Sequence, residues 1–214
     1  GGLFAASMTS APLHAREAFP VATYDPRAAL CVTDVQNDFA DPTGGLYVPE
    51  GEKVVPLVND AILRARAAGA FVVYTQDWHP AATPHFAKDG GVWPVHCVRD
   101  TWGAEFHPEL TVEGPVVRKG TAGEDGYSGF TVADPRTGDR SATQLDRLLR
   151  ERRVRVLVVV GLATDYCVKA TALDAVAGGY TTIVPREGVR AVDLEPGDGE
   201  RALDEMRAAG VVVE

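Results

Sequence analysis

Short apolar runs alternate with helical segments along the chain, and this alternation constrains the fold more than any other feature. We expect strands at residues 28–33, 70–74, 115–118, 154–160, 180–184 and 211–213. We expect helices at residues 52–68, at 141–151 with Ser141 as the N-cap residue, from Cys167 to Ala177, and at about 199–209. Strands that alternate with helices predict an α/β fold with a parallel sheet, whose ligand crevice lies at the carboxyl ends of the strands.

A single domain accounts for most of the 214 residues. A chain of roughly this length can bury about 70% of the surface that it exposes when unfolded. We assign residues 28–214 to this domain and residues 8–27 to an N-terminal arm. Residues 1–7 lack the basic and apolar regions of a signal peptide, so we expect them to be a remnant of cloning.

The charge balance and the lengths of the apolar stretches argue against nucleic acid and membrane as partners, and the cysteine pattern indicates the compartment. Lys and Arg number 21 against 30 Asp and Glu, and the net charge of −9 disfavours binding to nucleic acid. The longest apolar stretch, Val156 to Ala163, is far shorter than the roughly 20 residues that span a membrane. The three cysteines form no disulfide framework, which predicts a reducing compartment, the cytoplasm.

Polar residues follow the first two strands at the point where each strand ends. Asp34 comes directly after residues 28–33, and the cluster of residues 75–79 follows the second strand. In a parallel sheet these carboxyl ends meet at one edge, so we expect these residues to lie close together. The irregular segment 80–110 reads as a long ordered loop, and such loops are usually functional.

Cys167 is the candidate nucleophile. It follows an apolar strand and opens a helix, where unpaired N–H groups and the helix dipole favour a thiolate. The alternative is a buried structural cysteine, which is the ordinary role of a lone cysteine. Cys31, in the middle of a predicted strand, and Cys97 have no such setting, and we interpret both as structural.

A thiolate that cleaves an acyl compound needs a group that can donate and accept protons. Asp34 could serve in this role at the same edge of the sheet. Lys119, at the end of a third strand, would bring a cation beside Asp34 and Cys167 and orient both. Taken singly, a strand-end Asp is more often a cap and a Lys before Gly more often a solvated loop residue.

A second group of residues has the chemistry of metal ligands. Asp77, His79, His85 and His96 lie within twenty residues, and one carboxylate with imidazoles suits Zn, Fe(II) or Mn. The alternative is that these histidines are structural. His14 and His107 are assigned no role.

Five motifs in order make the chain resemble the nicotinamidase branch of the isochorismatase-like cysteine hydrolases. They are the segments 34–39 (DVQNDF), 77–80 (DWHP), 93–97 (WPVHC), 119–120 (KG) with 127–130 (YSGF), and 161–168 (GLATDYCV). The resemblance implies a single three-layer α/β/α domain with a six-stranded, mainly parallel sheet. It implies the triad Asp34, Lys119 and Cys167, the metal ligands Asp77, His79 and His96, and His85 as a fourth ligand found in some members.

The resemblance also implies the reaction, which is hydrolysis of nicotinamide to nicotinate and ammonia through a thioester on Cys167, a step of NAD salvage. Pyrazinamide differs little in shape and is expected to be a substrate too. The oxyanion would meet the N–H groups of Ala163 and Cys167, beside a cis peptide bond between Leu162 and Ala163. The metal would hold the pyridine nitrogen. The residues expected around the ring are Phe39, Trp93, Tyr127, Leu162 and Tyr166.

Two features depart from the familiar family pattern. The stretch from Lys119 to Tyr127 is one residue longer, and Tyr166 stands where some relatives have His. The first feature leaves the role of Tyr127 open, and the second predicts a different pocket polarity.

Other functions stay open on the sequence. A carbamoyl or ureido amidase of the same superfamily would need the triad but not the metal cluster. Isochorismatase itself would not need the cysteine, and a binding module would have lost a member of the triad. The sequence does not fix the metal or the oligomeric state, and a homo-oligomer is compatible with it.

Overall fold

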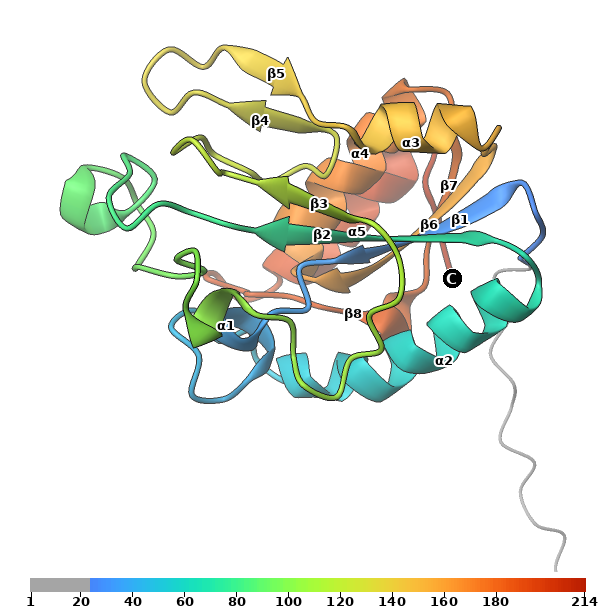
Figure 1. Ribbon diagram of the computed structural model, residues 1–214, viewed down its shortest axis with the longest axis horizontal. Coiled ribbons are helices and arrows are strands. Elements are labelled where there is room, and N and C mark those ends of the chain that lie inside the picture. The colour runs from blue at the N-terminus through green and yellow to red at the C-terminus, as the bar shows by residue number, and fades with distance from the viewer. Residues whose placement is uncertain (1–23) are drawn as a thin grey trace, which may run out of the picture.

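The computed structural model describes residues 24–214, and its central feature is a parallel sheet between two layers of helices (Figure 1). Residues 1–7, expected to be a remnant of cloning, and residues 8–23 of the expected arm lie outside the described residues. Among residues 24–214, no helix is both long and apolar enough to cross a membrane.

The elements alternate along the chain much as the sequence predicts. The strands are β1 (Ala28–Thr33), β2 (Phe71–Asp77), β3 (Val116–Lys119), β4 (Thr131–Ala133), β5 (Arg140–Ala142), β6 (Val156–Leu162), β7 (Thr181–Val184), β8 (Val189–Arg190) and β9 (Val212–Val213). The α-helices are α1 (Asn37–Ala40), α2 (Val54–Ala67), α3 (Leu145–Glu151), α4 (Lys169–Ala177) and α5 (Asp198–Ala208). Short 3-10 helices cover Gly51–Lys53, Ala87–Asp89, Trp102–Ala104 and Arg186–Gly188, and a π-helical turn covers Thr164–Val168.

The main sheet has the order β3-β2-β1-β6-β7-β9, with β8 paired to β6, and all of its pairs are parallel. The parallel α/β architecture is therefore confirmed. Among the described residues the sheet has seven strands, one more than the six expected. The additional strand is β8, whose two residues are too short to give a recognisable pattern in the sequence.

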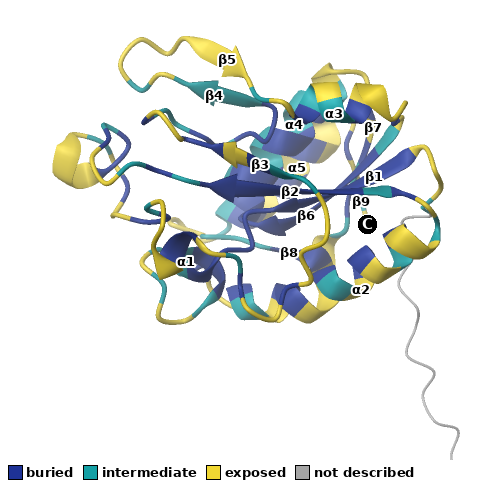
Figure 2. Ribbon diagram, in the orientation of Figure 1, coloured by how far each residue is buried: buried dark blue, intermediate teal, exposed yellow. Residues whose placement is uncertain are grey.

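Two apolar cores, one on each face of the sheet, hold the three layers together. On one face α2 packs its buried side chains, including Val58 and Ile62, against β1, β2 and β6. On the other face α3, α4 and α5 pack against the alternate residues of the same strands. The central strands β1, β2 and β6 are almost continuously buried, as Figure 2 shows and as expected for a parallel sheet covered on both faces.

A small antiparallel hairpin replaces part of a predicted helix. Ser141 lies in β5 and pairs with Val132 of β4, so its predicted role as an N-cap residue is wrong. The helix begins at Leu145 instead, and the Thr143 hydroxyl accepts a hydrogen bond from the Leu145 N–H at 3.1 Å. Figure 1 shows the hairpin at the top of the molecule, beside the edge of the main sheet formed by β3.

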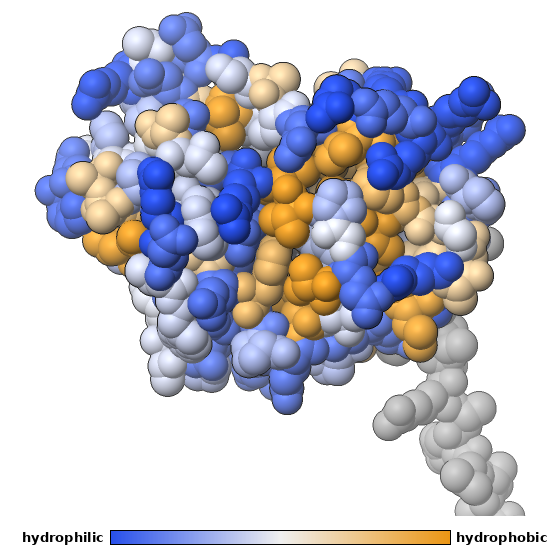
Figure 3. All heavy atoms as spheres, in the orientation of Figure 1, coloured by the Kyte–Doolittle hydropathy of each residue, from blue (hydrophilic) through white to orange (hydrophobic). Residues whose placement is uncertain are grey.

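The visible face of the molecule carries both hydrophilic and hydrophobic residues. In Figure 3 hydrophobic atoms form a band across the middle of the visible face, over the region of β2 and β3, with hydrophilic areas on either side.

Gly161 gives the fold a position that a larger residue cannot take without distortion. Its φ is +112°, and a Cβ atom added there would lie 2.1 Å from the carbonyl oxygen of Thr33 on the neighbouring strand β1. We therefore expect Gly161→Ala to lower the free energy of unfolding by about 3 kcal/mol, since the two central strands must separate locally. Denaturant unfolding followed by circular dichroism measures this loss.

Gly179→Ala is the matched control for this prediction. Gly179 also has a positive φ, +90°, but a Cβ atom added there meets nothing within 4 Å. The control variant keeps the penalty of placing alanine at a positive φ but has no collision with a neighbouring atom. It should therefore lower the free energy of unfolding by only about 1 kcal/mol. Equal losses in the two variants would show that the contact with Thr33 has no effect on stability.

Candidate active site

Four neighbouring strands bring the candidate catalytic residues to one edge of the sheet. Asp34 directly follows β1, Asp77 ends β2, Lys119 ends β3, and Cys167 lies in the π-helical turn after β6. Because β3, β2, β1 and β6 are adjacent and parallel, their carboxyl ends meet at the same edge. This is the arrangement that the polar strand ends predict.

The ammonium group of Lys119 lies at the centre of this group. Its Nζ is 2.7 Å from Asp34 Oδ2, 3.0 Å from Asp77 Oδ1 and 3.4 Å from Cys167 Sγ. It also donates to the carbonyl oxygens of Gly126 and Tyr127. Burial lowers the pKa of Lys119, but the two carboxylates outweigh burial and raise that pKa well above its ordinary value. The side chain is therefore a fixed cation shared by both acids.

Asp34 is fully buried beside this cation. Its Oδ1 accepts a hydrogen bond from the Thr75 hydroxyl at 2.7 Å, while Oδ2 faces Lys119. Burial raises the pKa of the Asp34 carboxyl, although Lys119 lowers it. A carboxylate whose pKa is raised in this way is a better proton acceptor than an exposed one.

The prediction of an acidic thiol at Cys167 is wrong for the structure as described. Burial raises the pKa of this thiol well above its ordinary value, and Lys119 only partly opposes the effect. Moreover, Cys167 lies within the π-helical turn, and α4 begins two residues later. The thiol therefore needs a base. One atom each of Asp34, Asp77 and Cys167 lie within 4.8 Å of one another, which gives the thiol a carboxylate in reach.

The backbone before Cys167 has the predicted special geometry. The peptide bond between Leu162 and Ala163 is cis. Leu162, Ala163 and Cys167 all line the cleft, and an oxyanion site at the N–H groups of Ala163 and Cys167 stays a prediction.

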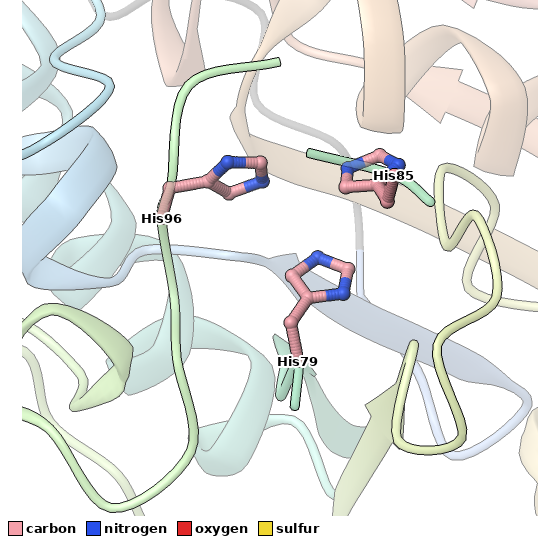
Figure 4. Close-up of side chains that lie close together, drawn as sticks. All are labelled: His79, His85 and His96. Atoms are coloured by element: carbon pink, nitrogen blue, oxygen red, sulfur yellow. The ribbon is translucent and has the colours of Figure 1, made fainter. Parts of the chain in front are cut away.

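Three histidines from two neighbouring segments meet next to Asp77. One ring nitrogen from each of His79, His85 and His96 lies within 4.8 Å of the others, and Figure 4 shows the three rings turned toward a common centre. Asp77 Oδ2 lies 3.6 Å from His79 Nε2 and 4.0 Å from His96 Nε2. The four residues singled out in the sequence as metal ligands are thus brought together.

The hydrogen bonding of these rings leaves nitrogen lone pairs for a metal. Both ring nitrogens of His79 are buried without a hydrogen-bond partner among the described residues. In His96 and His85, Nδ1 is engaged, by the Pro94 carbonyl at 2.7 Å and by Asp125 Oδ1 at 2.5 Å respectively. Their Nε2 atoms are left to face the cluster. The donor set therefore fits a divalent transition metal.

Burial keeps the imidazoles in the form that binds metal. It lowers the pKa of His96 to about 4 and also lowers the pKa of His85, so both rings are neutral at pH 7. Burial pushes the pKa of the Asp77 carboxyl up, but Lys119 and then the imidazoles outweigh burial, and the net pKa lies below its ordinary value. Neutral imidazoles with an ionised carboxylate are the protonation states that metal ligands require.

A cleft lies between the thiol and the histidine cluster. The residues predicted to contact substrate all line it, namely Phe39, Trp93, Tyr127, Leu162 and Tyr166. The Trp93 indole N–H donates to the Tyr127 hydroxyl at 2.7 Å, and the rings of Trp93 and Tyr166 meet edge to face at 4.9 Å. The walls thus form a slot that suits a flat aromatic ring.

Sequence reasoning missed several residues that shape this site. Leu46, Val48 and Val192 also line the cleft, but nothing in their local pattern marks them. Gln36 pairs its side chain with the backbone of Asp77, accepting from the Asp77 N–H and donating to the Asp77 carbonyl, both at 2.8 Å. Its position two residues after a strand-end Asp is the signal that could have marked it.

Cys31, Cys97 and His107, which the sequence assigns no catalytic role, do not line the cleft. Cys31 and Cys97 are buried, and burial raises the pKa of both thiols. His107 accepts a hydrogen bond from the Glu109 N–H and does not belong to the histidine cluster. His14 lies outside the described residues.

Comparison with known proteins links this site to one family. The model of the isochorismatase domain matches residues 28–214. The chain is 40% identical over 206 residues to the nicotinamidase of Escherichia coli, an alignment that covers 88% of this chain and 94% of the relative.

Two solved structures are similar over most of their length. The pyrazinamidase of Pyrococcus horikoshii in complex with zinc has a TM-score of 0.79 and 40% identity, covering 88% of this chain and 99% of the other. PnC1 from L. infantum in complex with nicotinate has a TM-score of 0.81 and 33% identity, covering 90% of this chain and 94% of the other.

Proposed function

This chain belongs to the isochorismatase domain family, and from that premise we propose that it hydrolyses nicotinamide to nicotinate and ammonia. Pyrazinamide, with the same carboxamide and a ring nitrogen, is proposed as a second substrate. Nicotinamidase relatives that match most of the chain support this activity.

One observation carries the proposal. A single cleft has a buried Cys–Asp–Lys group on one side and an Asp–His cluster with unpartnered ring nitrogens on the other. The first group can cleave an amide, and the second can hold a metal that binds a ring nitrogen. A substrate that carries both a carboxamide and a ring nitrogen can engage both groups from within this one cleft.

In the acylation step, Asp34 takes the proton of the Cys167 thiol as the sulfur attacks the carboxamide carbon. The carbonyl π electrons move to oxygen, and the backbone N–H groups of Ala163 and Cys167 stabilise this oxyanion. When the oxyanion collapses, the carbon–nitrogen bond breaks and Asp34 returns its proton to the departing ammonia. The product of this step is a thioester on Cys167.

In the deacylation step, Asp34 takes a proton from water as the water oxygen attacks the thioester carbon. Collapse of the second tetrahedral intermediate breaks the carbon–sulfur bond and releases nicotinic acid, which loses its proton to water and becomes nicotinate. The sulfur recovers a proton from Asp34, which restores the starting state. Lys119 stays charged throughout, because its two carboxylate partners hold its pKa high.

Asp77, His79, His85 and His96 are the residues that we propose hold a divalent metal. Zinc, Fe(II) and manganese all suit this donor set. The bound metal supplies a Lewis acid that anchors the ring nitrogen, while Phe39, Trp93 and Tyr127 hold the faces and edge of the ring. We also propose a cytoplasmic role in NAD salvage, which agrees with three free cysteines among the described residues.

Ammonia release from nicotinamide tests the function directly. We expect release by the purified chain as isolated, loss of release after chelation, and recovery when zinc, Fe(II) or manganese is restored. Release that survives complete chelation would contradict the metal role and leave the triad intact. If no metal restores release, the amide substrate is wrong, and carbamoyl and ureido compounds are the alternatives to assay.

A further inference from the structure

Asp125 contacts the histidine cluster from outside and is used by no step above. Its Oδ1 lies 2.5 Å from His85 Nδ1, and the two residues are 40 positions apart in the chain. We propose that Asp125 is a positioning residue that sets the orientation and donor strength of His85 and thereby makes it a ligand of the metal. This inference rests on the metal site of the proposed function.

The backbone of Asp125 is fixed by the small hairpin. The Asp125 N–H donates to the Ala133 carbonyl at 2.8 Å, and the Ala133 N–H donates back to the Asp125 carbonyl at 2.9 Å. Ala133 is the last residue of β4, which pairs with β5. The hairpin therefore holds the carboxylate of Asp125 at a defined place over the cluster.

The segment that carries His85 is tied to the same loop by a second contact. The Thr83 hydroxyl donates to the Gly123 carbonyl at 2.7 Å, and its oxygen accepts from the His85 N–H at 3.2 Å. Asp125 is thus held by backbone hydrogen bonds to Ala133, and His85 is held by a hydrogen bond from its N–H to the Thr83 hydroxyl. Because both residues are held in place, the His85–Asp125 contact has a fixed geometry, unlike an ion pair between two mobile surface side chains.

The contact decides which nitrogen of His85 faces the cluster. With Nδ1–H donating to the carboxylate, Nε2 carries the free lone pair. The ring then stacks on His79 with centroids 4.7 Å apart and an interplanar angle of 23°. A carboxylate on the outer nitrogen of a ligating imidazole fixes its tautomer and makes the inner nitrogen a stronger donor.

His96 offers a comparison within the same cluster. Its Nδ1 faces the neutral carbonyl of Pro94 at 2.7 Å, whereas His85 faces an ionisable carboxylate at 2.5 Å. Hydrogen bonds to a charged acceptor are roughly twice as strong as those between neutral groups. Loss of Asp125 should therefore affect metal binding through His85 specifically.

Zinc affinity, measured by competition with a chromogenic chelator, tests this inference. We expect Asp125→Asn to weaken Zn²⁺ binding by about 10- to 100-fold, since an amide can present its NH₂ group to Nδ1 and reverse the tautomer. The matched control is Glu124→Gln, which removes the same charge from the adjacent residue, whose carboxylate accepts a hydrogen bond from the Ala122 N–H at 2.8 Å and takes no part in the His85 contact. The control should bind Zn²⁺ like the unchanged chain.

The same measurement in a His85→Ala background separates positioning from a general structural effect. If Asp125 acts through His85, Asp125→Asn causes no further loss once His85 is gone. A loss of equal size in both backgrounds, or Zn²⁺ binding by Asp125→Asn equal to that of Glu124→Gln, would overturn the inference. Failure of the unchanged chain to bind Zn²⁺ would instead contradict the metal site of the proposed function.

Discussion

Cys167→Ala is expected to lower turnover of nicotinamide by more than about 10⁴-fold while leaving the ring-binding cleft in place. The sulfur is the only atom of the side chain that the reaction uses, and alanine keeps the Cβ atom. Binding of nicotinamide should persist, because the aromatic walls and the histidine cluster do not depend on the sulfur. Single-turnover ammonia release and equilibrium binding of nicotinamide measure the two effects separately.

Cys31→Ala is the control for this prediction. Cys31 is buried in the middle of β1, in the core that β1 forms with α3, α4 and α5, and it does not line the cleft. This variant should keep its turnover within a few fold. Mass spectrometry after an acid quench adds a second test, since the unchanged chain should carry a nicotinoyl group on the peptide that contains Cys167. Comparable activity in the two alanine variants would show that Cys167 is not the nucleophile.

Lys119→Met is expected to lower the free energy of unfolding of the metal-free chain by about 3–5 kcal/mol. Methionine nearly matches the length of the lysine stem but leaves Asp34 and Asp77 buried without their cation. Turnover should also be lost, because nothing then offsets the charge of Asp34 beside the sulfur. Denaturant unfolding followed by circular dichroism measures the loss in the free energy of unfolding.

The pH dependence of this loss identifies its cause. As pH falls through the range where carboxyl groups gain protons, the buried carboxylates of Lys119→Met become neutral and the stability difference should shrink. The control Lys169→Met removes a partly exposed lysine paired at 2.9 Å with the exposed Glu205, an ion pair that is worth less than about 1 kcal/mol. A difference that does not change with pH would mean that lost packing, and not uncompensated charge, explains the effect.

Much of the fold could be predicted from the sequence because the long strands are buried on both faces. Such strands appear as continuous apolar runs, and both β1 and β2 end in polar residues at the functional edge. The hairpin of β4 and β5 could not be predicted in this way. Its three-residue strands are half-buried or exposed, so they carry no periodicity, and Ser141 has the residue type of a helix cap.

By itself, the sequence determined which residue types reach the edge of the sheet, because strand ends and parallel pairing follow from local hydrophobic pattern. Only the tertiary structure decided their protonation and their partners. Burial around Cys167 reverses the acidity that a helix start would give, and the meeting of Asp125 with His85 joins two loops that no local pattern connects. The physical reason is that desolvation and contacts between distant segments arise only when the chain packs, whereas strand and helix patterns exist before it does.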